Sequence, residues 1–234
     1  MNYQYAIIGN GRVATHMLHY FKMLGIPHTH WHRKSTHSIK DVVAPATHVL
    51  LLVSDSAIDA VATENADLFS GKKVVHFSGA HNSPHVFSAH PLMTFCHELY
   101  AAEVYPTIPF VVTHEEPEFA TLLPGLLNAH YIIHASEKPY YHALAVMGCN
   151  FSTILWEKMI FELSNRYHIP KQAVMPIMRQ TFANLEKSSE PLAGPLSRKD
   201  TRTIADNLEA LKADPFREVY QGFVKAYAQE GDKL

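Results

Sequence analysis

The strongest constraint on the fold is a short glycine motif close to the N-terminus. A nearly continuous apolar segment, residues 3–8, runs directly into GNGRVA at 9–14, where a helical pattern begins. A tight turn between a strand and a helix surrounds a pyrophosphate with backbone N–H groups and the helix N-terminus. Gly9 permits the turn, Gly11 lets the backbone approach the phosphates, and the small Ala14 allows close packing of helix on strand. The residues expected at the phosphates are Gly9, Asn10, Gly11, Arg12 and Val13.

A basic cluster follows the second predicted strand, which covers His28 to His32. A site specific for NAD carries an acidic residue at this position, about 20 residues beyond the glycine turn. This chain has Arg33, Lys34 and Ser35 there instead. Guanidinium, ammonium and hydroxyl donors bind a ribose 2′-phosphate, which a carboxylate would repel. The cluster therefore predicts NADP(H) as the cofactor, with a solvated basic turn as the alternative.

The overall composition excludes several classes of protein. The 234 residues are 47% hydrophobic and 18% charged, as in an ordinary globular chain. A formal net charge of −2 provides no basic field for nucleic acid. Cys96 and Cys149 stand in different segments, which favours a reducing compartment over a disulfide framework. With no signal-peptide pattern, and an apolar stretch at 143–156 too short to span a bilayer, we expect a cytoplasmic protein without a membrane partner.

Histidine is frequent, with 17 in the chain, and His28, His30 and His32 would share one face of a strand. Such a face could bind zinc or copper. No thiolate or carboxylate completes a recognisable ligand spacing, and the strand lies where the cofactor domain needs it. We therefore predict no metal site and interpret most histidines as surface residues.

The order of predicted elements indicates an α/β fold followed by helices. Apolar strands at 49–53, 73–77, 109–112 and 131–133 alternate with helical patterns, one of them from about Pro117 to Asn128. This alternation predicts a mostly parallel, Rossmann-like sheet. Strand signals stop near residue 134, and helical patterns follow at 138–167, from Pro170, at 201–211 and at about 216–228, with a loop at 188–200. We predict a dinucleotide-binding domain at 1–134 and an all-helical domain at 135–234.

Ligands of open α/β sheets bind at the carboxyl ends of the strands, so the residues there are candidates by position. Ser54 and Asp55 follow the strand at 49–53, as a helix N-cap or as cofactor contacts. Ser78 and Gly79 follow the next strand, where small residues allow a nicotinamide ring to approach the backbone. His90 comes shortly afterwards, either as a proton-transfer group or as a loop histidine bonded to backbone.

The helical half contains polar groups within apolar surroundings. Asn150 lies in an apolar helical run, about two turns after Tyr141 and His142, and as a buried amide it would need partners. Those partners could be structural or a substrate. Arg198, in the loop GPLSRKD at 194–200, suits a carboxylate or phosphate. Asp200 is either a substrate contact or the N-cap of the following helix.

Seven segments in this order resemble a bacterial family that joins a Rossmann-like NADP-binding domain to a helical domain of unknown function, number 2520: GNGRVA at 9–14, HRKS at 32–35, VSDSAI at 53–58, HFSGA at 76–80, HPLMTF at 90–95, YHALAVMGCNF at 141–151 and GPLSRKD at 194–200. The family is distantly similar to pyrroline-5-carboxylate reductase, ketopantoate reductase and deazaflavin-dependent NADP reductases. The resemblance implies a homodimer formed through the helical domain, with the substrate between the domains. It matches Tyr141, His142, Asn150, Arg198 and Asp200 to motifs that face the cleft.

Two functions follow from these patterns. In the first, an NADP-dependent oxidoreductase exchanges hydride with a small carbonyl or imine compound. His90 then transfers the proton, Arg198 anchors an anionic group and Asn150 orients the substrate, with Tyr141, His142 and Asp200 as further contacts. In the second, the protein binds NADP(H) without catalysis and acts as a regulator or sensor, because no unmistakable catalytic constellation is present.

Overall fold

The computed structural model describes residues 3–230. The chain divides into two compact units, one up to Glu157 and one from Lys158 onward. Each unit is described by itself.

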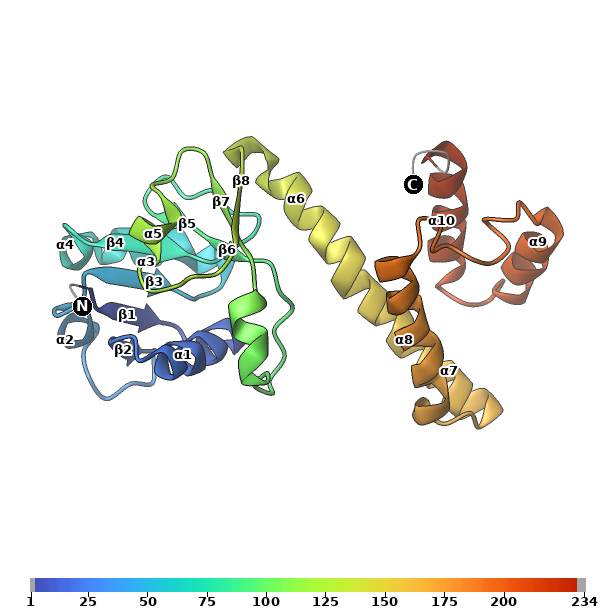
Figure 1. The fold of residues 1–234 in the computed structure, drawn as a ribbon, viewed down its shortest axis with the longest axis horizontal. Helices are drawn as coiled ribbons and strands as arrows, with labels where there is room; N and C mark the ends of the chain where they lie inside the picture. Colours follow the sequence, from blue (N-terminus) through green and yellow to red (C-terminus); the bar gives the residue numbers. More distant parts are fainter. Residues whose placement is uncertain (1–2, 231–234) are drawn as a thin grey trace. The chain divides into compact units, whose positions relative to one another are not determined.

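The first unit is built on a five-stranded parallel sheet in the order β2-β1-β3-β4-β5 (Figure 1). Its strands are β1 (Tyr5–Ile8), β2 (His28–Trp31), β3 (His48–Leu51), β4 (Lys73–His76) and β5 (Phe87–Ser88). The chain reverses its direction of travel across the sheet after β2, so β1 and β3 are neighbours at the point where ligands of such sheets bind.

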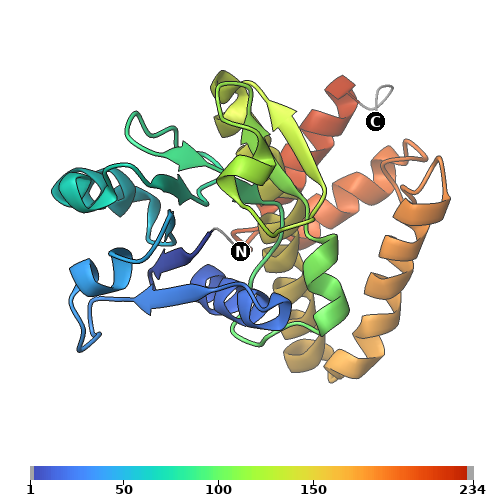
Figure 2. The ribbon, with the colours of Figure 1, turned by 60° about the vertical axis from the view of Figure 1, so that its left-hand side comes forward.

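Helices cover both faces of this sheet: α1 (Arg12–Leu24), α2 (Ile39–Val43), α3 (Ile58–Glu64) and α4 (Ala66–Phe69), with 3₁₀ turns η1 (Asp55–Ala57) and η2 (Ala102–Thr107). Successive residues of β1 point to opposite faces, as in any strand. Tyr5 and Ile7 pack with Phe21 of α1 in one core, whereas Ala6 and Ile8 belong to a second core with residues of α2 and α4. Figure 2 shows α1 along the sheet beside β1 and β2.

A smaller sheet continues the first unit. Strand β6 (His90–Pro91) pairs antiparallel with β7 (Phe110–Thr113), which pairs parallel with β8 (His130–Ile133). The two strands expected at 109–112 and 131–133 are present, but they form this second sheet. The helix expected from 117 to 128 is only α5 (Phe119–Leu122), because Pro124 and Gly125, at φ +90°, follow it at once.

One long helical segment runs continuously from the end of the sheet region (Figure 1). After η3 (Ala135–Glu137) it comprises α6 (Lys138–Ala145), the π-helical turn η4 (Val146–Phe151) and α7 (Ser152–Tyr167), and the boundary between the units falls inside α7. The remaining helices are α8 (Lys171–Lys187), α9 (Thr201–Ala210) and α10 (Arg217–Glu230). The predicted fold class, a mostly parallel α/β sheet followed by helices, is confirmed. The functional division at residue 134 stays a prediction.

Within residues 3–230, no helix is long and apolar enough to cross a membrane.

Candidate functional site

A cleft of about 1490 Å³ opens in the first unit at the carboxyl ends of the strands. It brings together most of the residues that the sequence indicated, from segments far apart in the chain. The predicted residues that line it are Gly9, Asn10, Gly11, Arg12, Val13, Arg33, Lys34, Ser54, Asp55, Ser78, His90, His142 and Asn150.

The glycine turn between β1 and α1 has the geometry of an anion cradle. Gly9 has φ +132°, and a Cβ there would overlap the carbonyl oxygen of Leu52, so no other residue fits. Gly11 is the N-cap of α1 and offers no side-chain cap, which leaves the first N–H groups of the helix free for a ligand. Open space surrounds the position of a Cβ at Gly11. A phosphate can therefore approach the backbone here.

The basic turn after β2 lies along the same cleft. Arg33 and Lys34 are exposed and line it. Ser35 lies outside the lining, and its Oγ accepts a hydrogen bond of 2.9 Å from the backbone N of His32, which closes the turn. The role of Ser35 at a 2′-phosphate stays a prediction.

The histidines of β2 contact backbone. His30 Nε2 lies 2.6 Å from the oxygen of Gly9, and His28 Nδ1 lies 2.8 Å from the oxygen of Ile26. In the part of the chain that the structure describes, no three His, Cys, Asp or Glu side chains form a group able to hold a metal ion.

Loop 78–82, which follows β4, forms hydrogen bonds with η1 and with η3. Ser78 Oγ donates to Asp55 Oδ2 at 2.6 Å and accepts from the N of His81 at 3.0 Å. On the other side, Asn82 Nδ2 donates to the oxygen of Ala135 at 2.9 Å, just before α6. Ser78 and Asp55, which follow neighbouring strands, are thus bonded to each other. Ser54 is the N-cap residue of η1 without a side-chain cap bond.

His90 is the centre of the other end of the cleft. Its Nδ1 lies 2.7 Å from the hydroxyl of Tyr141, and its ring meets His142 edge to face at 5.7 Å. A Cβ at Gly79 would overlap the His142 ring and crowd His90 Nε2, so only glycine fits between them. Tyr141 itself is not part of the cleft lining and stands behind His90.

Burial keeps this pair in one protonation state. It lowers the pKa of His90 to about 4, helped by the charges of His142 and Lys138, and raises the pKa of Tyr141 to about 12. Near neutral pH His90 is therefore an uncharged imidazole and Tyr141 keeps its proton. Because His90 Nδ1 is the hydroxyl's hydrogen-bond partner among the described residues, the arrangement favours donation from Tyr141, with the imidazole proton on Nε2.

Asn150 differs from its prediction. It lies in the π-helical turn and lines the cleft, but its side chain is exposed, so the expectation of a buried amide was wrong. The apolar residues around it do not enclose it, because Met147 and Phe151 are themselves 57% and 52% exposed. Single-turn π segments often occur at functional sites.

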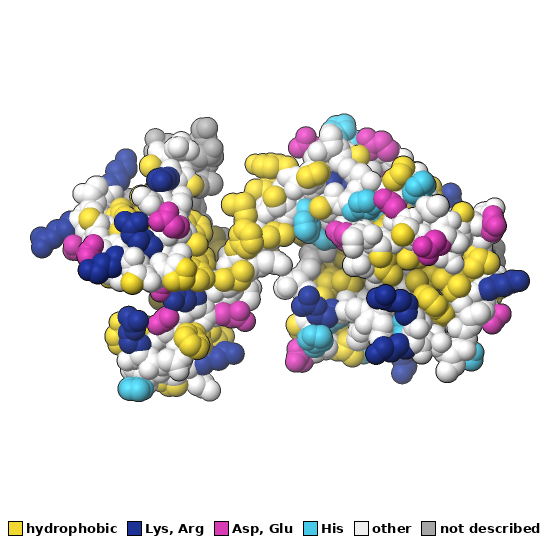
Figure 3. All heavy atoms as spheres, turned by 180° about the vertical axis from the view of Figure 1, so that it is seen from behind, with side chains coloured by type: hydrophobic (Ala, Val, Ile, Leu, Met, Phe, Trp, Pro, Cys, Tyr) yellow, Lys and Arg dark blue, Asp and Glu magenta, His cyan; other side chains and the backbone are white. Residues whose placement is uncertain are grey.

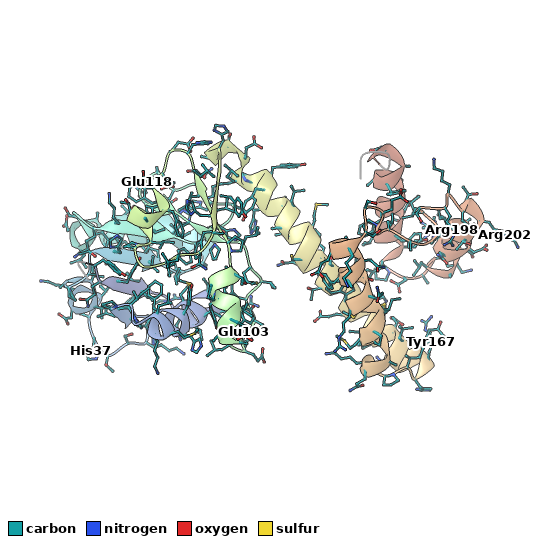
Figure 4. All side chains as sticks on the ribbon, viewed as in Figure 1. His37, Glu103, Glu118, Tyr167, Arg198 and Arg202 are labelled. Atoms are coloured by element: carbon teal, nitrogen blue, oxygen red, sulfur yellow. The ribbon has the colours of Figure 1, made fainter. Side chains whose placement is uncertain are left out.

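Arg198 and Asp200 belong to the second unit, and Figure 4 shows Arg198 beside α9. Asp200 caps that helix. Its Oδ1 accepts a hydrogen bond of 3.0 Å from the backbone N of Thr203, and its Oδ2 accepts one of 2.7 Å from the Thr203 hydroxyl. The bond from the Thr203 backbone also lowers the pKa of Asp200. The capping alternative is thus realised, and the substrate roles of both residues stay predictions.

Three polar residues that the sequence did not indicate have buried side-chain atoms: His76 and Lys138 are buried, and Glu116 is half-buried. Lys138 is only 3% exposed, and its Nζ donates to the oxygen of His81 at 2.5 Å. The atoms His76 Nε2 and Glu116 Oε2 are buried without a hydrogen-bond partner in the described chain. A lysine before a proline at the start of a helix gives no sign of burial, so the sequence offered no signal for it.

Comparisons with known proteins identify the family and the fold of the chain. Residues 108–227 match the model of a family described as Domain of unknown function (DUF2520), which confirms the resemblance seen in the motifs. No curated protein matches the sequence.

Several solved structures share the fold over nearly the whole length. A Bacteroides fragilis protein, provisionally described as an NADP oxidoreductase, is 19% identical, with a TM-score of 0.73 over 96% of this chain and 97% of the other. A reductive aminase from Aspergillus terreus, in complex with NADPH and ethyl levulinate, is 12% identical, with a TM-score of 0.70 over 99% and 95%. The pyrroline carboxylate reductase of Plasmodium falciparum, with NADP bound, is 12% identical, with a TM-score of 0.62 over 98% and 97%. At these identities the similarity establishes the fold.

Proposed function

The chain belongs to the DUF2520 family, and we propose that it is an NADP-dependent oxidoreductase that exchanges hydride with a small carbonyl or imine compound. The observation that carries the proposal is the composition of one cleft. The glycine turn and three cations, Arg12, Arg33 and Lys34, line it together with the uncharged imidazole of His90. The fold shared with NADP(H)-bound reductases supports the same function.

The residues present fit NADP(H). The open backbone at Gly11 and the free N-terminus of α1 suit the pyrophosphate, since both favour an anion. Arg33 and Lys34 would hold the 2′-phosphate with charge-assisted bonds. Loop 78–82, with Gly79 against His90 and His142, would bound the nicotinamide end.

The cofactor, when bound, supplies a hydride to the carbonyl or imine carbon, and the oxygen or nitrogen of the substrate takes up a proton, giving an alcohol or amine and NADP⁺. His90 Nε2–H is the donor toward that oxygen or nitrogen, and the imidazole recovers its proton from water. Tyr141 holds the ring and fixes its tautomer through Nδ1. His142 bounds the same end of the cleft, and Asn150 offers an amide to the substrate. Arg198 and Asp200 of the second unit are proposed as its further contacts, with Arg198 as the anchor of an anionic group.

A second copy of the chain is the proposed protein partner, through the helical region. Apolar side chains gather along the long helix (Figure 3), where Leu144, Met147, Phe151 and Ile154 are each about half exposed. Exposed apolar patches of this kind mark association sites. Light scattering of the purified chain tests this proposal, and a monomer at micromolar concentration would contradict it.

The function is tested by following NADPH oxidation with a panel of small ketones, keto acids and cyclic imines. We expect turnover with at least one class, and His90→Ala to lower it by about 10²-fold or more, the usual contribution of a general acid. His37→Ala is the matched control, because His37 is exposed and outside the cleft lining. Tight NADPH binding with no hydride transfer to any compound would favour the non-catalytic sensor instead.

A further inference from the structure

Lys138 is a buried cation beside the proposed reaction site. It is the first residue of α6 and is 3% exposed. Burying an ammonium ion is costly unless other groups compensate it. No carboxylate forms an ion pair with it among residues 3–230, and its hydrogen bond is the one to the oxygen of His81. Since a buried lysine cannot contribute to solubility, its surroundings indicate another role.

The hydrogen bond fixes loop 78–82 to α6. His81 is bonded by Lys138 through its oxygen, and its N–H donates to Ser78 Oγ. One turn further along α6 stand Tyr141 and His142, on the same side of the helix as Lys138 because residues three and four apart are neighbours. Tyr141 bonds His90, and His142 meets Gly79 of the loop. Lys138 therefore connects the two segments that pack against His90, which are α6 and loop 78–82.

Four titratable groups interact electrostatically with Lys138: Asp55 of η1, His76 of β4, His90 of β6 and Glu116 after β7. Loop 78–82 contacts it through the backbone oxygen of His81. Burial lowers the pKa of Lys138 to about 8, while the negative charges of Glu116 and Asp55 oppose that shift. The amine is thus protonated at neutral pH and loses its charge within the range in which a folded protein is easily studied.

We propose that Lys138 is a positioning residue of the reaction, whose buried positive charge acts on His90 and strengthens its Nε2–H as a donor toward the substrate. The inference rests on the proposed function, because a donor is required when hydride reaches a carbonyl carbon. An uncharged imidazole is a weak acid, and a fixed cation in a site of low dielectric constant stabilises negative charge that develops beside it.

The consequence is a pH dependence with a definite sign. As pH rises through about 8, Lys138 loses its charge and the donor becomes weaker. Carbonyl reduction should therefore slow on the alkaline side. Lys138→Arg keeps the charge and a donor for His81, and should abolish this decline. Lys138→Met removes the charge at every pH and should lower the rate of hydride transfer by about tenfold at pH 7.

The first experiment does not depend on activity. The histidine ¹³Cε1 signals of the protein are followed from pH 6.5 to 9.5, and the His90 signal is assigned from its loss in His90→Gln. Because His90 is itself uncharged in this range, a step with a midpoint near pH 8 reports the charge on Lys138. We expect the step in the wild-type chain and in Lys72→Met, and its absence from Lys138→Arg and Lys138→Met. Lys72 is the matched control, since its Nζ also donates to backbone oxygens, those of Ala44 and Ala46.

The second experiment measures single-turnover hydride transfer across the same pH range. A missing His90 step in the wild-type chain, or a step that persists in Lys138→Arg, would overturn the inference whatever the activity. The inference would also be overturned if the His90 step is present but the rate of hydride transfer neither declines at alkaline pH nor falls in Lys138→Met. The proposed function would then remain intact. A step without any hydride transfer would contradict the proposed function, and with it the role of Lys138.

Discussion

At the scale of single residues, the hydrogen-bond partners of one imidazole determine what it can do. His90 is uncharged because it is buried, and its Nδ1 is occupied by the Tyr141 hydroxyl. These two facts leave a single N–H available to a substrate. An isolated histidine on a loop would present either tautomer and would be charged in a large fraction of molecules at pH 6.

Tyr141→Phe tests the orienting bond. Without the hydroxyl, the imidazole proton can move to Nδ1, so we expect hydride transfer to slow by about 10-fold, the cost of losing one net hydrogen bond. NADPH affinity should stay unchanged, because Tyr141 lies outside the cleft lining. Tyr140→Phe is the control, since that neighbouring ring is 67% exposed. Equal single-turnover rates for wild type and Tyr141→Phe would refute this role.

Which residues line the candidate site was partly predictable from the sequence. His90, Asp55 and Ser78 could be named because they follow strands, and the carboxyl ends of parallel strands meet at one edge. The protonation state of His90 could not, since it arises from burial and from partners 51 residues away in the chain. The burial of Lys138 and the exposure of Asn150 likewise depend on tertiary packing that no local pattern encodes.

At the scale of elements, the β1–α1 turn contains two glycines that are present for different reasons. Gly9 is required by its positive φ and by the approach of Leu52, whereas Gly11 has ordinary extended backbone and open space. The fold requires the first glycine, whereas the second leaves open space for the proposed ligand.

Gly9→Ala and Gly11→Ala should therefore differ in kind. Gly9→Ala forces overpacking against backbone and should lower the free energy of unfolding by about 1–3 kcal/mol or more. Gly11→Ala should cost less stability than Gly9→Ala, because its extended backbone and open surroundings accept a methyl group. It should weaken NADPH binding, because that methyl group would stand where the proposed pyrophosphate lies. Thermal unfolding and fluorescence titration measure the two effects. Gly222→Ala in α10 is the control for NADPH affinity, since it has open space and no proposed contact with the cofactor. Unaltered NADPH affinity in Gly11→Ala would contradict the placement of the pyrophosphate.

Long, strongly patterned elements were predicted well, and short ones were not. The helical segments at 138–167 and 201–211 match α6–η4–α7 and α9 closely, because their apolar spacing extends over many turns. Strands β5 and β6 have two residues each, too few for any period to appear. The π-helical turn also escaped prediction, since one extra residue in a helix leaves the apolar pattern almost unchanged.

At the scale of the whole molecule, buried uncharged histidines make stability depend on pH. His76 is fully buried, and burial lowers its pKa to about 3. Below pH 6.5 the unfolded chain binds a proton at this residue that the folded chain does not, so the stability decreases as pH falls.

Between pH 6.5 and 5, this one group should reduce the free energy of unfolding by about 1–2 kcal/mol. In His76→Gln the decline should be smaller by that amount, because glutamine does not titrate and its side-chain oxygen can still accept from the N of Ser78. Urea denaturation at several pH values measures the slope, with His37→Gln as the control at an exposed position. Identical slopes for wild type and His76→Gln would show that folding does not lower the pKa of His76.

The central claim is that the cleft recognises the phosphorylated dinucleotide, and titration with NADPH and NADH side by side tests it most directly. Intrinsic fluorescence of the wild-type chain should show NADPH binding at least about tenfold tighter, since charge-assisted bonds to a phosphate contribute about 1.5–3 kcal/mol each. A variant carrying Arg33→Met and Lys34→Met should lose that preference while retaining NADH binding. NADH binding as tight as NADPH binding in the wild-type chain would contradict the account.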